Sequence, residues 1–348
     1  MTRVLLIKTS SLGDVIHCLP AISDLARSVE NLELDWAIEQ SLMEIAQLHP
    51  AVTSIVPVRL RYWRRHLLEP VTWREFGEFR RRISWRRYDR IIDAQGLIRS
   101  ALLARLASGP HCGYDRASVR EPPASLFYDC RYPVSVTVHA VERMRRLMAQ
   151  AMGYELPAEL DYGVRAGGGW PDWLAEGRYI VALHATARPD KGWSESAWIE
   201  LACRAAAAGL RVVLPWGSGR ERERSERIAA AAGGIAPPRL GFNELAQLLA
   251  GAATVVGVDT GLTHLASAVG APVVAIYAAS WWEFNGVIGP GYIANLGGPG
   301  AVPGVDEVWA KVEEARCCAR KVGAWRADLV EPPPELAGRR RFRPSPAR

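Results

Sequence analysis

The chain has 348 residues, a formal net charge of +6 and 49% hydrophobic residues, which fits a soluble globular protein long enough for two ordinary domains. Six cysteines occur without a CxxC pair, so we expect reduced thiols in a cytosolic protein rather than a disulfide framework. The apolar run 4–7 ends at Lys8 and is too short for a signal peptide. The uncharged stretch 265–282 contains Gly270 and Pro272, which predicts a helix, a turn and a strand instead of a membrane span.

Short β-branched segments alternate with helical patterns through the first half of the chain, which predicts βα units and a parallel sheet. The expected strands cover residues 3–7, 34–38, 54–58 and 89–95, and the expected helices include 14–29 and 100–107.

The same alternation restarts after residue 178. Strands are expected over 179–184, 210–216, 254–259 and 272–277, with helices over 194–209, 220–232, 261–270 and 305–322. The Gly-rich segment 165–177 is the best linker candidate. We therefore predict an α/β protein of two Rossmann-like parallel-sheet domains that face a central cleft. They cover residues 1–164 and 178–322, and a Pro- and Arg-rich, disordered tail follows over 323–348.

The sharpest local pattern is "VVGVDTGLTHLASAVGAP", residues 255–272. A buried strand ends at Asp259, and Thr260 and Gly261 open a helix whose first N–H groups lack intrahelical partners, so a diphosphate fits there. The alternative is structural: Asp259 or Thr260 caps the helix and His264 is a partly buried histidine. The "DTG" triplet of aspartic proteases belongs to β-rich folds, so we do not favour that function.

Two further segments follow strand ends on the same edge of the second sheet. Thr186 and Lys191 lie in "VALHATARPDKGW", where a lysine either neutralises a phosphate or is simply solvated in a loop. Glu221 opens a charged helix and either contacts a ribose or lies free in solvent. Arg222 occupies the place of the third glycine of a dinucleotide fingerprint, which disfavours NAD, and no GxxxxGK loop is present.

In the first domain, "SSLGD" places Gly13 and Asp14 between a strand and a helix. The glycine permits positive φ or close approach of another molecule. The aspartate either caps the helix or accepts a proton from an attacking hydroxyl, and the residues alone leave both roles open.

Residues 59–90 contain eleven arginines against four acidic residues, with Trp63, Trp73 and Trp85 between them. A solvated helical face explains part of this. The mixture of arginine and tryptophan suits an anionic membrane surface or a phosphorylated, carboxylated amphiphile, and nucleic acid is the weaker alternative. Arg116 and Arg120 add to the basic residues of this domain.

Several stretches together resemble the bacterial ADP-heptose:lipopolysaccharide heptosyltransferases, which are GT-B enzymes. The resemblance spans residues 1–320, and the first two stretches are similar to the heptosyltransferase I branch. The stretches are "KTSSLGDVIHCLPA", "DAQGLIRSALLARLA", "REPPASLFYD", "HAVER", "HATARPDKGW", "LPWG" and "VDTGLTHLASA".

The resemblance implies transfer of L-glycero-D-manno-heptose from ADP-heptose to the inner Kdo of Kdo-lipid A, with inversion at the anomeric carbon. It implies that Asp14 is the general base and that Lys191 neutralises the leaving diphosphate. The remaining roles are donor contacts at Thr186, Ala187, Glu221, Leu240, Asp259, Thr260, Gly261 and His264, and acceptor contacts at Gly13, Arg61, Arg65 and Arg120.

The resemblance also implies a cytoplasmic enzyme at the inner face of the anionic inner membrane, with no nucleic-acid partner. No cofactor or metal is expected, because a helix N-terminus and Lys191 can neutralise the diphosphate, although the sequence does not decide whether Mg²⁺ assists. One departure falls at 278–286, "AASWWEFNG", where relatives continue with glycine, threonine and proline. If this loop prevents donor use, the chain is instead a non-catalytic scaffold that holds a lipid A precursor.

Overall fold

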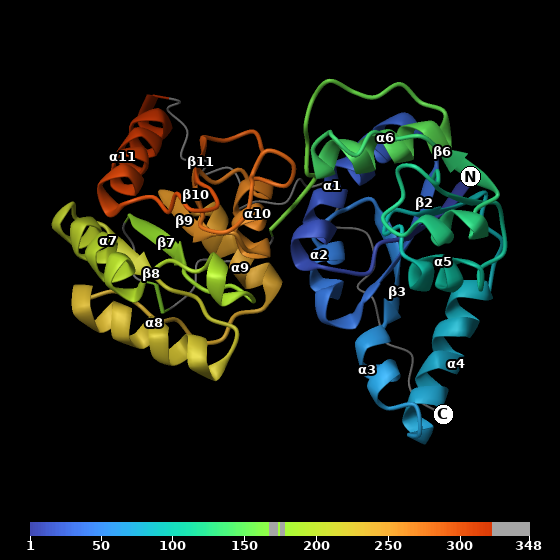
Figure 1. Ribbon diagram of the computed structural model, residues 1–348, viewed down its shortest axis with the longest axis horizontal. Coiled ribbons are helices and arrows are strands. Elements are labelled where there is room, and N and C mark those ends of the chain that lie inside the picture. Colours follow the sequence, from blue (N-terminus) through green and yellow to red (C-terminus); the bar gives the residue numbers. More distant parts are fainter. Residues whose placement is uncertain (167–172, 175–177, 322–348) are drawn as a thin grey trace, which may run out of the picture.

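The computed structural model describes residues 1–166, 173–174 and 178–321, and its two halves are each built on a parallel sheet (Figure 1). The prediction of two parallel-sheet α/β domains is confirmed. Most of the predicted linker 165–177 and the whole predicted tail 323–348 lie outside the described residues, so the domain boundaries stay predictions.

The first sheet has six strands in the order β3-β2-β1-β4-β5-β6, and all neighbouring strands are parallel. Its elements are β1 (Thr2–Ile7), α1 (Leu12–Ser28), β2 (Leu32–Glu39), η1 (Gln40–Leu42), α2 (Met43–Gln47), β3 (Val52–Val58), α3 (Leu60–Arg65), α4 (Pro70–Ser84), β4 (Arg90–Asp93), α5 (Ile98–Ala104), β5 (His111–Tyr114), η2 (Pro122–Phe127), β6 (Cys130–Tyr132) and α6 (Ala140–Met152).

The second sheet has five parallel strands in the order β11-β10-β9-β7-β8. Its elements are β7 (Tyr179–Leu183), η3 (Pro189–Lys191), α7 (Glu195–Ala207), β8 (Arg211–Val213), α8 (Gly219–Ala232), α9 (Phe242–Ala250), β9 (Thr254–Val258), α10 (Gly261–Ala268), β10 (Val273–Tyr277), β11 (Ile293–Gly297) and α11 (Val305–Lys321).

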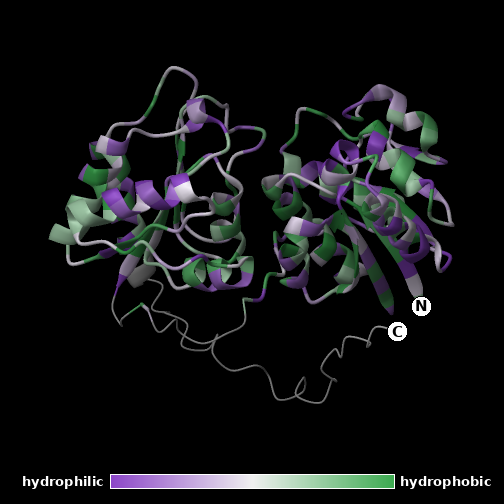
Figure 2. Cartoon of the chain, turned by 90° about the horizontal axis from the view of Figure 1, so that it is seen from below, coloured by the Kyte–Doolittle hydropathy of each residue, from purple (hydrophilic) through white to green (hydrophobic). Residues whose placement is uncertain are grey.

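The strands are apolar because helices cover both faces of each sheet. All five residues of β7, β9 and β10 are buried, and Figure 2 shows hydrophobic strands beneath helices that carry hydrophilic residues. The domains meet through two helix pairs, α1 with α10 and α2 with α9. Since α1 follows β1 and α10 follows β9, the carboxyl ends of two central strands lie at this interface.

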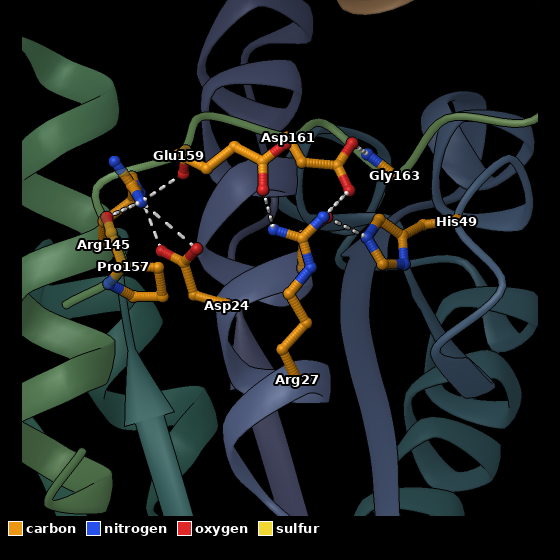
Figure 3. Close-up of polar contacts among 9 residues, drawn as sticks. Asp24, Arg27, His49, Arg145, Pro157, Glu159, Asp161 and Gly163 are labelled. Atoms are coloured by element: carbon orange, nitrogen blue, oxygen red, sulfur yellow. Dashed lines mark hydrogen bonds and ion pairs between the residues drawn. The ribbon is translucent and has the colours of Figure 1, made fainter. Parts of the chain in front are cut away.

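A buried ion pair fixes the segment that leaves the first domain after α6 (Figure 3). Arg145 of α6 donates to both carboxylate oxygens of Asp24 in α1, at 2.7 and 3.2 Å. The same guanidinium donates to the carbonyls of Pro157 and Glu159, at 2.6 and 2.9 Å. One side chain therefore joins two helices to the segment that leads toward the second domain.

Candidate functional site

Asp14 caps α1 from the third position of the helix. Ser11 is the N-cap residue, and Asp14 Oδ2 accepts hydrogen bonds from the Ser11 backbone N–H at 3.0 Å and from its hydroxyl at 2.9 Å. The other oxygen, Oδ1, lies 3.7 Å from Lys8 Nζ. The capping role considered from the sequence is therefore present, while Oδ1 accepts no hydrogen bond from Ser11.

Lys8 sits directly after β1 and is only 3% exposed. Its ammonium has the Ala94 carbonyl at 3.4 Å as well as the Asp14 carboxylate. Burial alone would raise the pKa of Asp14, but Lys8, the two hydrogen bonds from Ser11, and Arg120 together lower it below its usual value. Asp14 is thus held ionised at neutral pH.

Two glycines lie where α1 meets α10. Gly13 is helical, without the positive φ that the sequence allowed for, and a Cβ there would lie 3.5 Å from His264 Cδ2, an ordinary contact distance. Gly261 is the more constrained position, because a Cβ would lie 2.5 Å from Leu12 Cγ. The glycine that permits close approach is therefore Gly261, and what approaches it is the first turn of α1.

Asp259 lies one residue beyond β9 and connects three loops of the second domain. Its Oδ2 accepts from Lys191 Nζ and from the Ser280 hydroxyl, each at 2.5 Å. Its backbone carbonyl accepts from the Thr186 hydroxyl at 3.3 Å. Lys191, Thr186 and Asp259 are therefore brought together as the sequence predicts for residues at one edge of a sheet.

The charge state of Asp259 follows from these contacts. Burial on its own would raise the pKa of Asp259, but the hydrogen bonds from Lys191 and Ser280, with the Lys191 charge, lower it. Thr260 is the N-cap residue of α10 and its side chain makes no capping hydrogen bond. The purely structural role considered for this motif therefore does not describe Thr260, and the start of α10 lies beside a lysine.

Three histidines lie at the domain interface. His17 Nε2 and His264 Nδ1 are 3.1 Å apart, and their rings meet edge to face. His139 packs edge-on against His17, with ring centroids 5.7 Å apart. Burial, chiefly, lowers the pKa of all three, that of His264 to about 4. His264 is buried at the interface, whereas the structural alternative considered from the sequence expected it to be only partly buried.

The other predicted donor residues lie farther along the same sheet edge. Glu221 is the third residue of α8, and its carboxylate accepts from the Gly217 backbone N–H at 2.7 Å. Leu240 is partly buried just before α9. Ala187 is exposed in the loop between β7 and η3.

The predicted acceptor arginines have different neighbours in the structure. Arg120 is near enough to Asp14 to lower the pKa of that carboxyl. Arg61 on α3 faces Glu39 at the end of β2, where burial raises the Glu39 pKa against the opposing charge of Arg61. Arg65 is exposed at the end of α3, and among the described residues no contact joins it to Asp14.

Four residues of this region were not found by reasoning from the sequence. Lys8, His17, His139 and Ser280 all lie in stretches named above, but none was given a role, although a lysine at the end of an apolar strand is a signal that can be read. His139 and Ser280 carry no such signal, because their contacts are with distant segments. The departure loop 278–286, which the scaffold alternative takes to prevent donor use, places the Ser280 hydroxyl on Asp259.

Across the described ranges, no group of three or more His, Cys, Asp and Glu side chains is arranged to hold a metal ion. The helices of these same ranges include none that combines the length and the apolar character needed to cross a bilayer.

Comparison with known proteins gives a consistent result. The family model for glycosyltransferase family 9 (heptosyltransferase) matches residues 76–305. Lipopolysaccharide heptosyltransferase 1 of Pseudomonas aeruginosa is 45% identical over 294 residues, covering 82% of this chain and 81% of that protein. The protein of the same name from Salmonella typhimurium is 40% identical over 298 residues, covering 85% and 92%.

Solved structures agree. The structure of E. coli heptosyltransferase WaaC with ADP matches with a TM-score of 0.83 and 36% identity, covering 90% of this chain and all of that one. The complex of WaaC with ADP-2-deoxy-2-fluoro heptose matches with a TM-score of 0.79 and 36% identity, over 93% of this chain and all of that one. The expectation of a GT-B arrangement is thereby confirmed.

Proposed function

The chain belongs to glycosyltransferase family 9, the heptosyltransferases, and from that membership we propose that it moves L-glycero-D-manno-heptose from ADP-heptose to the inner Kdo of Kdo-lipid A. Heptosyl transfer from ADP-heptose in lipopolysaccharide synthesis rests on the family, on the relatives named above and on the WaaC complexes. Inversion at the anomeric carbon and the Kdo acceptor are what the proposal adds.

The observation that supports it most directly is the pairing of charges across the α1–α10 contact. On the first domain, Asp14 is an ionised carboxylate beside Lys8 and Arg120. On the second, Lys191 and the start of α10 offer positive charge next to Asp259. A single displacement requires the attacking hydroxyl, with its base, and the leaving group on opposite faces of the anomeric carbon, and a base and a diphosphate site on opposite domains can provide this.

In the proposed reaction the acceptor hydroxyl attacks the anomeric carbon from the face opposite to ADP. The new C–O bond forms, the bond to the diphosphate breaks, and the hydroxyl proton passes to Asp14. A carboxylate of lowered pKa is a weak base, so it accepts the proton late, when the hydroxyl has become acidic through bond formation. Lys191 and the N-terminus of α10 stabilise the charge that develops on the departing diphosphate.

Binding roles follow the resemblance and the placement of each residue. Thr186, the Ala187 backbone, Asp259, Thr260 and Gly261 would contact the diphosphate and sugar, beside His264. Glu221 would accept from the ribose and Leu240 would pack near the adenine. Gly13, Arg61, Arg65 and Arg120 would hold the acidic acceptor. The enzyme would act in the cytoplasm, at the inner face of the inner membrane.

The test uses ADP-heptose and Kdo-lipid A whose acyl chains have been removed. We expect ADP release, a product heavier by one heptose, and an anomeric configuration opposite to that of the donor. The matched variant is Asp14→Asn, whose amide oxygen can still accept from Ser11 but cannot take a proton. Its transfer rate should fall by roughly 10²- to 10⁴-fold, with ADP affinity unchanged.

Three results would contradict the proposal in different ways. If Asp14→Asn keeps its transfer activity, Asp14 is not the general base. If the product keeps the anomeric configuration of the donor, the reaction is not a single displacement. ADP binding without any product places the non-catalytic scaffold first, with the 278–286 loop as the cause.

No metal is required in this proposal, because Lys191 and α10 supply the positive charge. Transfer should therefore persist in excess EDTA, while Lys191→Met should lose about 3 kcal/mol of transition-state stabilisation, or roughly a hundredfold in rate. Loss of activity in EDTA that Mg²⁺ restores would assign part of that role to the ion.

A further inference from the structure

The hairpin of α3 and α4 projects from the first domain, well away from the second (Figure 1). Residues 66–69 join the two helices, and we call them, together with the first turn of α4 (70–73), the tip. Leu68 is 99% exposed, Leu67 56% and Trp73 61%. Three large apolar side chains therefore lie in solvent at the end of a protrusion.

Polar contacts hold the tip in this shape. The Trp73 indole N–H donates to the Leu67 carbonyl at 2.8 Å. The Tyr62 hydroxyl donates to Glu69 Oε2 at 2.6 Å, and the Tyr62 ring stacks on His66 with centroids 4.1 Å apart. The backbone of the tip is thus partly satisfied from within, and its leucines point outward from a structured turn.

The charges around the tip are unbalanced. Its two nearest acidic residues are engaged, Glu69 with Tyr62 and Glu75 with Arg59 and the Trp63 indole. The exposed arginines at the ends of the two helices have no ion pair among the described residues; they are Arg64, Arg65 and Arg74. Along α4 follow the exposed Arg80, Arg81 and Arg82.

Size separates the candidate partners. A stable protein interface buries about 800 Å² on each partner, far more than two leucines and a tryptophan on a narrow tip present. A bilayer surface needs only a few apolar side chains in the boundary between headgroups and acyl chains, with basic residues at headgroup level. Arg64, Arg65 and Arg74, which form no ion pair with any residue that the structure describes, complement anionic headgroups.

We propose that the tip docks the enzyme on an anionic bilayer, with Leu67 and Leu68 inserted at the acyl boundary, Trp73 at headgroup level, and Arg64 and Arg74 on lipid phosphates. This inference rests on the proposed function, since an acceptor anchored in a membrane brings the enzyme to that surface. It assigns the membrane contact to one short segment, the tip, which contains none of the residues proposed to take part in the reaction.

The test separates membrane docking from chemistry. Wild-type protein and Leu67→Ser/Leu68→Ser are compared in sedimentation with vesicles of phosphatidylglycerol and phosphatidylcholine, and of phosphatidylcholine alone. The control is Val302→Ser, which removes an apolar side chain of 53% exposure from the second domain. We expect the double variant to bind the anionic vesicles at least tenfold more weakly, and Arg74→Gln about fivefold more weakly, with the control unchanged.

Transfer is then measured on two forms of acceptor. With the acceptor embedded in vesicles, the double variant should lose at least tenfold in kcat/KM. With the deacylated acceptor in solution, it should match the wild type. An inactive wild type on the soluble acceptor would overturn the proposed function and leave the vesicle result standing on its own.

Other results would overturn the docking proposal itself. These are a wild type that does not bind anionic vesicles, and a double variant that binds them as tightly as the wild type. A third is a change of oligomeric state in the double variant, by sedimentation velocity, with vesicle binding intact; this would make the tip a contact between copies of the chain.

Discussion

His17 of the first domain and His264 of the second share a hydrogen bond of 3.1 Å although 247 residues separate them. One ring must donate and the other accept, so at most one of them can be charged, and burial lowers the pKa of both rings, which favours the neutral forms. His264 is also faced by Asp259 and Asp14, which favour its charged form, and by His139 and Lys191, which oppose it.

Acid should weaken the folded state through this pair. Burial, chiefly, lowers the pKa of His264 from 6.5 to about 4, so the stabilisation is complete above pH 6.5 and is lost as the pH falls toward 4. For His264 alone the loss between pH 7 and pH 5 is about 2 kcal/mol. The free energy of unfolding is measured in urea at pH 7 and at pH 5. The difference between the two values should be smaller by about 2 kcal/mol in His264→Gln than in the wild type. An equal difference in both proteins would contradict the assignment.

Removing Lys8 should change the pH dependence of transfer. Lys8 is the leading favourable charge beside Asp14 and lowers the pKa of that carboxyl. In Lys8→Met the acidic limb of the pH profile of kcat/KM should therefore move to higher pH. Thermal unfolding serves as the control for folding, and an unmoved limb in a folded variant would show that Lys8 does not set the ionisation of Asp14.

Ser280 should matter through its hydroxyl. Ser280→Ala removes the donor to Asp259 Oδ2, and a hydrogen bond to a charged group contributes enough that kcat/KM should fall by about tenfold. Ser280→Thr keeps the hydroxyl and is the matched control. If Ser280→Ala and Ser280→Thr have the same kcat/KM, the serine has no part in holding Asp259. A double-mutant cycle with Asp259→Asn would then show additive effects.

The Asp24–Arg145 pair should dominate the stability of the first domain. Both groups are buried, so Asp24→Ala leaves the Arg145 guanidinium with only the longer ion pair to Glu142, at 3.6 Å, and should cost about 3–5 kcal/mol in free energy of unfolding. Asp24→Leu/Arg145→Leu removes both charges and should cost less than the single change. A double variant less stable than Asp24→Ala would show that the contacts of Arg145 with Pro157 and Glu159 carry the stability instead.

Much of the fold could be predicted because parallel strands are read as apolar runs. The predicted bounds of β7, β9 and β10 agree with the observed bounds within a few residues. The alternation of such strands with helices predicted the two parallel sheets. The carboxyl ends of strands then pointed to Asp14 at the first sheet and to Lys191 and Asp259 at the second, since side chains that follow parallel strands converge at one edge of their sheet.

What could not be predicted depends on contacts between distant segments. No periodicity in the sequence relates His17 to His264, or Ser280 to Asp259. The reach of Lys8 to Asp14 depends on how α1 turns back over the end of β1, which residue types do not specify. The need for glycine at position 261 likewise arises from Leu12 of the other domain.

The loop that departs from the family pattern belongs mechanically to both domains. Its Ser280 holds Asp259 in the second domain, while its Phe284 and Gly286 carbonyls accept from the Ala140 N–H at 2.8 Å and from His139 at 3.0 Å in the first domain. Separating the domains breaks the second pair of contacts and frees the peptide that carries the first. We therefore expect release of ADP to be coupled to separation of the two domains, and the turnover rate should respond to solvent viscosity more than that of a relative without this loop.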